Sequence, residues 1–176
     1  GLDLDTGAFA NADAIARLLV ALATLAFALL VASGAVLYIV LDTSVHGAYG
    51  SIRALADWPL GSGALLRGVH RYAADMLVLT MALHLLREWL HRHDGGVHRF
   101  AWLTGALLIG FVFVAAIGGF WLNWDQLGQF SAIATAEWID ALPLFATPLA
   151  RNFLTTGAVS DRLFSLFVFV HLGVAL

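Results

Sequence analysis

The chain has no cysteine and no lysine, and charged residues of any kind are scarce. They make up 12% of its 176 residues, whereas soluble domains average about 25%. The lack of cysteine excludes disulfides, iron–sulfur ligation by this chain and thiol catalysis. With a net charge of −3 and no basic stripe, the composition predicts no nucleic-acid partner. All nine cations are arginine, which together with abundant Ala, Leu and Gly indicates a GC-rich bacterial genome.

Apolar sequence takes the place of charge, since 61% of the residues are hydrophobic. About 20 consecutive apolar residues suffice to cross a bilayer as a helix. The sequence therefore predicts an all-α fold, a transmembrane four-helix bundle. We also expect a short amphipathic helix over residues 130–145, lying at the membrane interface. The four spanning segments are predicted over residues 14–41, 63–90, 100–122 and from residue 161 to the end.

This pattern divides the chain into residues 1–13, an N-terminal cytoplasmic segment, and residues 14–176, one transmembrane domain. The fourth apolar segment is about 16 residues long, or roughly 24 Å, which is short of the roughly 30 Å core of a bilayer. We therefore expect the native polypeptide to continue beyond Leu176 and to complete this helix.

Arginines near the helix ends predict the orientation in the membrane. Arg92 and Arg99 lie in the loop 91–99 between the second and third segments, and Arg87 precedes it closely. Cations in short loops mark the cytoplasmic side. We expect a multi-pass protein of the bacterial cytoplasmic (inner) membrane, with loop 91–99 in the cytoplasm.

Two histidines interrupt the second apolar segment, in the stretch "GVHRYAADMLVLTMALHLLRE". His70 and His84 are fourteen residues apart. At 100° and 1.5 Å per residue they face the same side of a helix, about 21 Å apart along its axis. A neutral imidazole is a good ligand for iron, and no other residue type in this chain ligates haem as readily. By the predicted orientation, His84 lies near the cytoplasmic face and His70 near the opposite face.

Each histidine has an arginine one helical turn further outward, Arg67 before His70 and Arg87 after His84. The two propionates of a haem point toward the aqueous faces, and a guanidinium at this position pairs well with them. Charges near the ends of a membrane helix otherwise cost several kcal/mol. The spacing thus predicts Arg67 and Arg87 as propionate partners.

Three glycines inside apolar segments add to this pattern. Gly105 and Gly119 on the third segment are also fourteen residues apart, and Gly34 lies well inside the first segment. A flat macrocycle between helices needs positions without a side chain, which glycine provides. Taken singly, each of these glycines is more often a helix-packing residue.

At this point the sequence resembles the cytochrome b of the quinol-oxidising bc1 and b6f complexes, in its amino-terminal four-helix half. The likeness covers the chain from about residue 14. It is carried by "LLRGVHRYAADMLVLTMALHLLRE", "WLTGALLIGFVFVAAIGGFWLNWDQ", "SAIATAEWIDALPLF" and "DRLFSLFVFVHL".

The resemblance implies two b haems, each held by one histidine from the second helix and one from the fourth. His70 would pair with His171 near the periplasmic side. His84 would pair with a histidine fourteen residues beyond His171, at position 185, which lies outside this chain. The residues present would therefore fully ligate one haem of the two. Gly34 and Gly119 are expected to line the haem of His70, and Gly105 the haem of His84.

The chain departs from the family pattern at several places, one of them Val20, where the family usually has a second glycine. The family's Pro-Trp-Gly turn reads Asn123-Trp124-Asp125 here. Arg71 and Asp75 are also atypical, and their i,i+4 spacing predicts an ion pair, with a proton-relay role for Asp75 as the alternative.

Other polar residues have less specific readings. Asp125 and Gln126 either contact a quinone head group or begin the surface helix, and the second interpretation is favoured. His46 is expected to be solvated. An ordinary interfacial loop, rather than a metal site, is favoured for the group formed by His91, His93, His98 and Asp94.

The sequence thus predicts a membrane-bound b-type cytochrome that carries electrons across the bilayer through two stacked bis-histidine haems. It would exchange electrons with the quinone pool, as an electron-transfer subunit of a quinol/quinone oxidoreductase complex. The expected partners are membrane lipid, quinone, redox partner subunits (cytochrome c or an iron–sulfur protein) and a second copy in a homodimer. One alternative is a haem-b anchor subunit of a dehydrogenase or reductase without quinol bifurcation, which the altered tryptophan turn favours. The other is a haem-free helical transporter or assembly protein.

Overall fold

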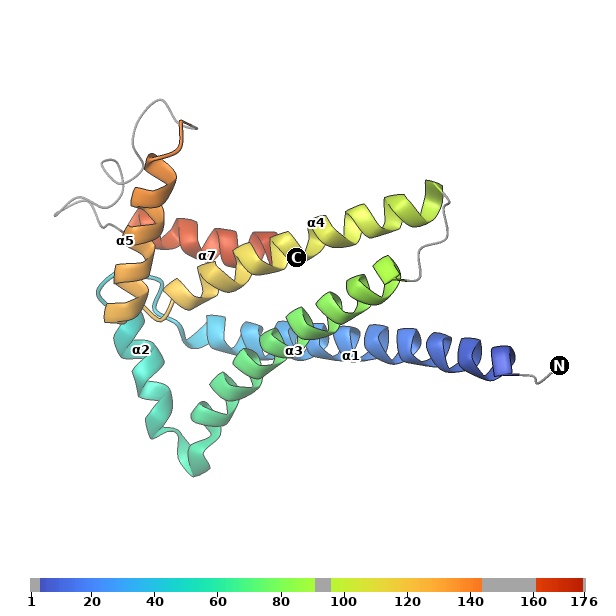
Figure 1. Ribbon diagram of the computed structural model, residues 1–176. Coiled ribbons are helices and arrows are strands. Elements are labelled where there is room, and N and C mark those ends of the chain that lie inside the picture. The colour runs from blue at the N-terminus through green and yellow to red at the C-terminus, as the bar shows by residue number, and fades with distance from the viewer. Residues whose placement is uncertain (1–3, 91–95, 144–160, 176) are drawn as a thin grey trace. The chain divides into compact units, whose positions relative to one another are not determined.

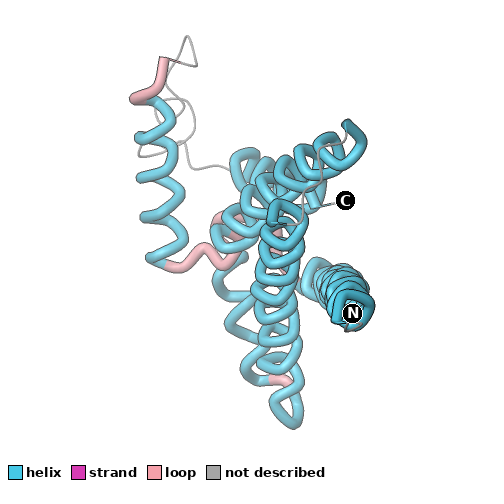
Figure 2. The backbone as a smooth tube through the Cα atoms, turned by 45° about the vertical axis from the view of Figure 1, so that its right-hand side comes forward, coloured by secondary structure: helices cyan, strands magenta, loops and turns pink. Residues whose placement is uncertain are grey.

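The computed structural model describes residues 4–90, 96–143 and 161–175, and every regular element in these ranges is a helix (Figure 1, Figure 2). The all-α prediction is confirmed for this part of the chain. The long helices are α1 (Leu4–Val40), α3 (Ser62–Leu90), α4 (Gly96–Trp121), α5 (Gln126–Asp140) and α7 (Asp161–Ala175). The short ones are α2 (Ala48–Ala54) and two 3₁₀ turns, η1 (Leu55–Asp57) and η2 (Pro59–Gly61).

The helix bounds agree with the apolar segments at most ends. Helix α3 begins one residue before the predicted start and ends at the predicted residue, Leu90. Helix α1 instead begins at Leu4, ten residues before the apolar segment. The cause is that hydropathy marks only the apolar part of a helix, whereas residues 4–13 are more polar and continue the same helix.

Two helices contain stretches that are long and apolar enough to cross a membrane, Asp13–Val40 in α1 and Arg99–Trp121 in α4. Helix α3 has 29 residues, but the charges of Arg67, Arg71 and Asp75 lower its hydropathy. Charge, and not length, therefore separates α3 from α1 and α4.

The connection from α1 to α3, between two of the predicted spans, contains α2, η1 and η2. Gly63 packs against the backbone of Leu55, so closely that a Cβ atom at position 63 would overlap the Leu55 carbonyl. Leu60 and Gly61 have positive φ values of 57° and 71°, which form the turn into α3. These contacts depend on tertiary packing and leave little trace in the hydropathy pattern.

Residue contacts divide the chain into two compact units. The first contains Gly1–Val36 and Leu65–Phe111, and the second contains Leu37–Ala64 and Val112–Leu176. The first unit carries His70 and His84, and the second carries His171. Each unit therefore contributes its own candidate ligands.

The second unit has an apolar core around Trp124, which is 6% exposed. The ring of Trp124 meets that of Phe164 edge-on at a centroid distance of 5.6 Å. Its backbone has a positive φ of 48°, a conformation that is uncommon for residues other than glycine. The core residues Ala48, Ala132, Phe164, Phe167 and Val168 surround it. Burial of this large ring offsets the cost of the unusual backbone.

Candidate functional site

His70 lies on α3 against two neighbouring residues of α1. Its Nδ1 atom is 3.0 Å from the hydroxyl oxygen of Ser33. A Cβ atom on Gly34 would lie 3.0 Å from Cε1 of His70, which is tighter than an ordinary carbon–carbon contact. The imidazole therefore packs against α1 at a place where Ser33 offers a hydroxyl group and Gly34 has no side chain.

His171 lies on α7 against a comparable surface of α4. Its Nδ1 atom is 2.7 Å from the backbone carbonyl oxygen of Ala115. A Cβ atom on Gly119 would lie 2.5 Å from Cε1 and 2.8 Å from Nδ1 of His171. No side chain fits there while the ring keeps this position. At the neighbouring Gly118 an added Cβ would stand 3.6 Å from the nearest atoms of His171, an ordinary van der Waals distance.

Aromatic packing sets the rotation of α7 about its own axis. Phe164, Phe167 and His171 follow the i, i+3, i+7 spacing of one helix face. Phe164 is fully buried, and the ring centroid of Phe167 lies 5.0 Å from that of Trp121 at the end of α4. Because the two phenylalanines are held against Trp121 and Trp124, the next residue on this face, His171, points toward α4.

His84 occupies a different kind of environment. Its Nδ1 atom is buried and has no hydrogen-bond partner among the described residues. Gly105 lies beside Leu85, the residue after His84, and an added Cβ would lie 2.9 Å from Cδ2 of Leu85. That Gly105 lines the haem of His84 stays a prediction. Trp102 donates from Nε1 to the Leu85 carbonyl at 3.2 Å. Gly105 and Trp102 thus position the end of α3 that carries His84.

The two arginines differ in their surroundings. The side chain of Arg87 is 16% exposed, lies 3.6 Å from Asp13 of α1 and also contacts Glu88. Arg67 is exposed. The carboxylates beside Arg87 belong to the chain itself. The pairing of Arg67 and Arg87 with haem propionates therefore stays a prediction.

The predicted ion pair between Arg71 and Asp75 is wrong for this structure. Both side chains are exposed, and the ion pairs among the described residues join Arg87 to Asp13 and Glu88. The i,i+4 spacing permits such a pair, but an exposed pair gains little free energy over two solvated groups.

Asp125 has a structural role that agrees with the favoured interpretation. Its side chain accepts a hydrogen bond of 2.7 Å from the backbone N–H of Gly128 and forms the N-cap of α5, which begins at Gln126. Helix α5 therefore starts four residues before the predicted position. This cap explains why an aspartate follows Trp124 in the altered tryptophan turn.

The remaining histidines add no further cluster. His46 is exposed, as predicted. His91, His93 and Asp94 lie outside the described residues, as does the side chain of His98. Within the described ranges, no group of three or more His, Cys, Asp or Glu side chains is placed to hold a metal ion. Axial ligation of a haem iron needs only two histidines, because the porphyrin nitrogens supply the other ligands.

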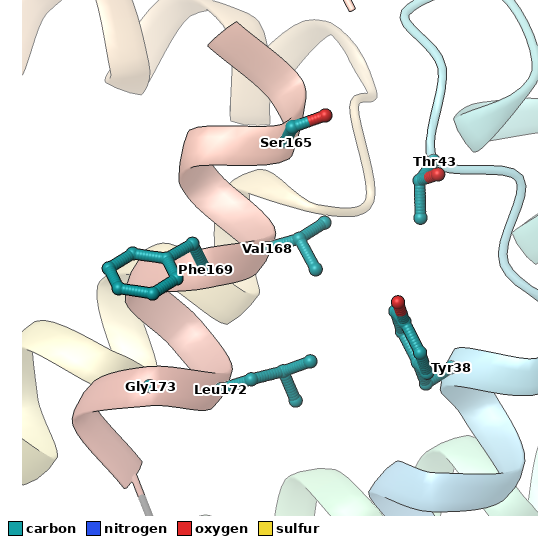
Figure 3. Close-up of a pocket in the computed structure, with 7 residues that line it drawn as sticks. All are labelled: Tyr38, Thr43, Ser165, Val168, Phe169, Leu172 and Gly173. Carbon is teal, nitrogen blue, oxygen red and sulfur yellow. The ribbon is translucent and has the colours of Figure 1, made fainter. Parts of the chain in front are cut away.

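A cavity of about 420 Å³ opens beside α7 in the second unit (Figure 3). Val168 and Leu172 point toward Tyr38 and Thr43, whereas Phe169 points away. The other lining residues are Ser165 and Gly173. His171 is not among them, so the cavity and this histidine belong to different faces of α7.

Two groups at the site were missed in the sequence. Ser33 is the one hydroxyl residue in the apolar run from Leu25 to Leu37 and directly precedes Gly34, which is a signal that could have found it. The carbonyl of Ala115 leaves no signal, because any residue supplies the same backbone atom.

The chain is similar to known cytochromes. Residues 14–176 match the model of the family described as cytochrome b/b6/petB. The chain is 30% identical over 150 residues to a cytochrome b6 of Mesostigma viride, covering 82% of this chain and 68% of that protein. It also resembles a chain of a solved hyperthermophilic respiratory complex III, with a TM-score of 0.74 and 22% identity.

That structural match covers 91% of this chain and 43% of the complex III chain, so this chain spans less than half of that protein. The likeness confirms the predicted fold class. The extent of the family match, over residues 14–176, confirms the resemblance seen in the motifs: the chain belongs to the cytochrome b family.

Proposed function

We propose that this membrane cytochrome b carries electrons across the bilayer through two stacked b haems, with His70, His84 and His171 as axial ligands. Membership of the family implies haem b. The observation that best supports the proposed ligands is the pair of histidines on one unbroken helix, α3, which spans Ser62–Leu90. Along such a helix His70 and His84 are separated by about 21 Å, most of the thickness of a bilayer core.

The residues present fit such a cofactor. Bound haem would supply an iron that gains and loses one electron at a time. Ligation needs the lone pair of a neutral imidazole nitrogen. At His171 the partner of Nδ1 is the Ala115 carbonyl, which can only accept, so Nδ1 carries the proton and Nε2 carries the lone pair. At His84 the Nδ1 atom is buried and is therefore shielded from water.

The surrounding residues would hold the macrocycle and its charges. Gly34 and Gly119 each face a histidine ring and would line the haem held by His70 and His171, while Gly105 would lie nearer to the other haem. Arg67 and Arg87 would pair with propionates.

The wider setting follows the same proposal. We expect exchange of electrons with quinone, redox partner subunits (cytochrome c or an iron–sulfur protein) and a second copy of the chain. The inner membrane of a bacterium is the expected location, with loop 91–99 in the cytoplasm. Similarity to a cytochrome b6 and to a complex III chain supports this setting over a haem-free transporter.

The experiment is a dithionite-reduced spectrum of the protein in its native membrane complex, with haem counted as the pyridine haemochrome. We expect a sharp reduced α band and two haems. His70→Ala should remove one low-spin signal in electron paramagnetic resonance and spare the other, while His46→Ala, a change at an exposed histidine, should leave both. Absence of haem from the wild-type protein would support the transporter alternative. An unchanged spectrum in His70→Ala would refute the assignment of this ligand.

A further inference from the structure

Ser33 is one of two buried polar side chains in the described part of the chain, with 5% exposure, and Thr80 is the other, with 4%. Both hydroxyl groups bond to carbonyls of their own helix. Thr80 donates to the carbonyl of Met76 at 2.7 Å, or to that of Leu77 at 3.0 Å. Ser33 differs from Thr80 because its hydroxyl also lies within hydrogen-bond distance of His70.

The hydroxyl of Ser33 has three neighbours but only one proton. Its Oγ atom is 2.5 Å from the carbonyl oxygen of Leu29, 3.3 Å from that of Leu30 and 3.0 Å from Nδ1 of His70. A carbonyl oxygen only accepts hydrogen bonds. The short distance to Leu29 places the hydroxyl proton there, which leaves the oxygen lone pairs of Ser33 to accept from His70.

We propose that Ser33 is a positioning residue that holds His70 as the tautomer with its proton on Nδ1. The lone pair is then on Nε2, the nitrogen that would ligate a haem iron. This inference rests on the proposed function and adds the group that selects the ligating nitrogen of His70. Gly34, the next residue, leaves no side chain beside Cε1 of the same ring, where an added Cβ would lie at 3.0 Å. This dipeptide therefore sets both the proton and the position of the imidazole.

The chemistry predicts a direction for the redox potential. An acceptor on Nδ1–H raises the basicity of a ligating histidine, and a more basic ligand favours the oxidised iron. Removal of the Ser33 hydroxyl should therefore raise the midpoint potential of the haem that His70 holds. The other haem should keep its potential, because its ligand His84 has no bond to Ser33.

The test compares three variants in the native membrane complex: Ser33→Ala, Ser33→Thr and Thr80→Ala. We expect Ser33→Ala to raise the midpoint potential of one haem in a redox titration and to weaken its binding about 10-fold or more. Ser33→Thr keeps a hydroxyl that bonds to the carbonyl four residues earlier. Its midpoint potential and haem affinity should therefore equal those of the wild type. Thr80→Ala removes a buried hydroxyl of the same kind and should change neither.

Wild-type potentials and haem content in Ser33→Ala would overturn the inference, and so would an equal shift in Thr80→Ala. If Ser33→Ala fails to assemble, Ser33→Cys decides, because a thiol of similar size is a weaker acceptor and should raise the same potential by a smaller amount. An unshifted potential in Ser33→Cys would count against the proposal. Loss of haem from the wild-type protein would instead refute the proposed function.

Discussion

Nδ1 of His171 lies 2.7 Å from the carbonyl oxygen of Ala115, one turn of α4 before Gly119. This oxygen is also the regular acceptor for the N–H of Gly119 in the helix. His171 is therefore held by the backbone, whereas His70 is held by the side chain of Ser33. No substitution at position 115 removes the acceptor of His171, so its environment is changed only through the glycine beside it.

Gly119→Ala should weaken haem binding at His171 by roughly 10-fold or more. The new Cβ would stand 2.5 Å from Cε1 of the ring, so the ring must turn and lose its bond to Ala115. The control is Gly118→Ala, where the Cβ would be 3.6 Å from His171 and which shares the helix-propensity gain of about 1 kcal/mol. Haem titration of both variants measures the difference. Equal affinities would show that Gly119 serves helix packing alone.

Arg87→Gln should lower the midpoint potential of the haem at His84, because loss of a nearby positive charge favours the oxidised iron. Asp13→Asn should not lower it, since this change removes a negative charge instead. The Asp13 side chain is 71% exposed, and exposed pairs contribute about 0–1 kcal/mol, so Asp13→Asn should also have little effect on stability. A redox titration of each variant measures the potential, and an unchanged potential in Arg87→Gln would argue against a propionate contact.

Asp125→Ala should destabilise the protein by about 1 kcal/mol through loss of the α5 N-cap, without loss of haem. Asp125→Asn keeps an oxygen that can accept from the N–H of Gly128 and should be close to wild type. Thermal unfolding followed by circular dichroism measures the stability. If Asp125→Asn were as damaging as Asp125→Ala, the carboxylate charge would matter for another reason, such as contact with a ligand.

Trp124→Ala should cost about 3–5 kcal/mol, the usual range for removing a large aromatic side chain from a core. Phe164 and Phe167 would also lose a packing partner. Helix α7 would then no longer be held in the rotation that points His171 toward α4. Trp138, which is 67% exposed on α5, provides the control, and Trp138→Ala should cost less than about 1 kcal/mol. Chemical unfolding gives the two values, and similar costs would contradict the assigned core.

The apolar segments and the histidine spacing predicted the long helices because both depend on local sequence. Helix α3 ends at the predicted residue, and Gly34 and Gly119 indeed lie against histidine rings. That these glycines line a haem stays a prediction.

Features that depend on contacts between distant segments were not predicted. Helix α2 forms in a polar stretch that hydropathy treats as a loop. Asp13 becomes a partner of Arg87, and the carbonyl of Ala115 a partner of His171, only when helices pack. That Gly105 lies beside Leu85 was likewise not predicted, because the residue that meets a glycine depends on the rotation of the opposite helix.

The two membrane-spanning stretches have unequal lengths, 28 residues in α1 and 23 in α4. At 1.5 Å per residue they measure about 42 Å and 35 Å, against a bilayer core of about 30 Å. A segment with such an excess tilts or thickens the lipid around it. Helix α1 therefore has the greater hydrophobic mismatch and should respond more strongly to bilayer thickness. In thin bilayers the ends of α1 would emerge first, and Asp13, at the start of its span, would move into water together with its contact to Arg87.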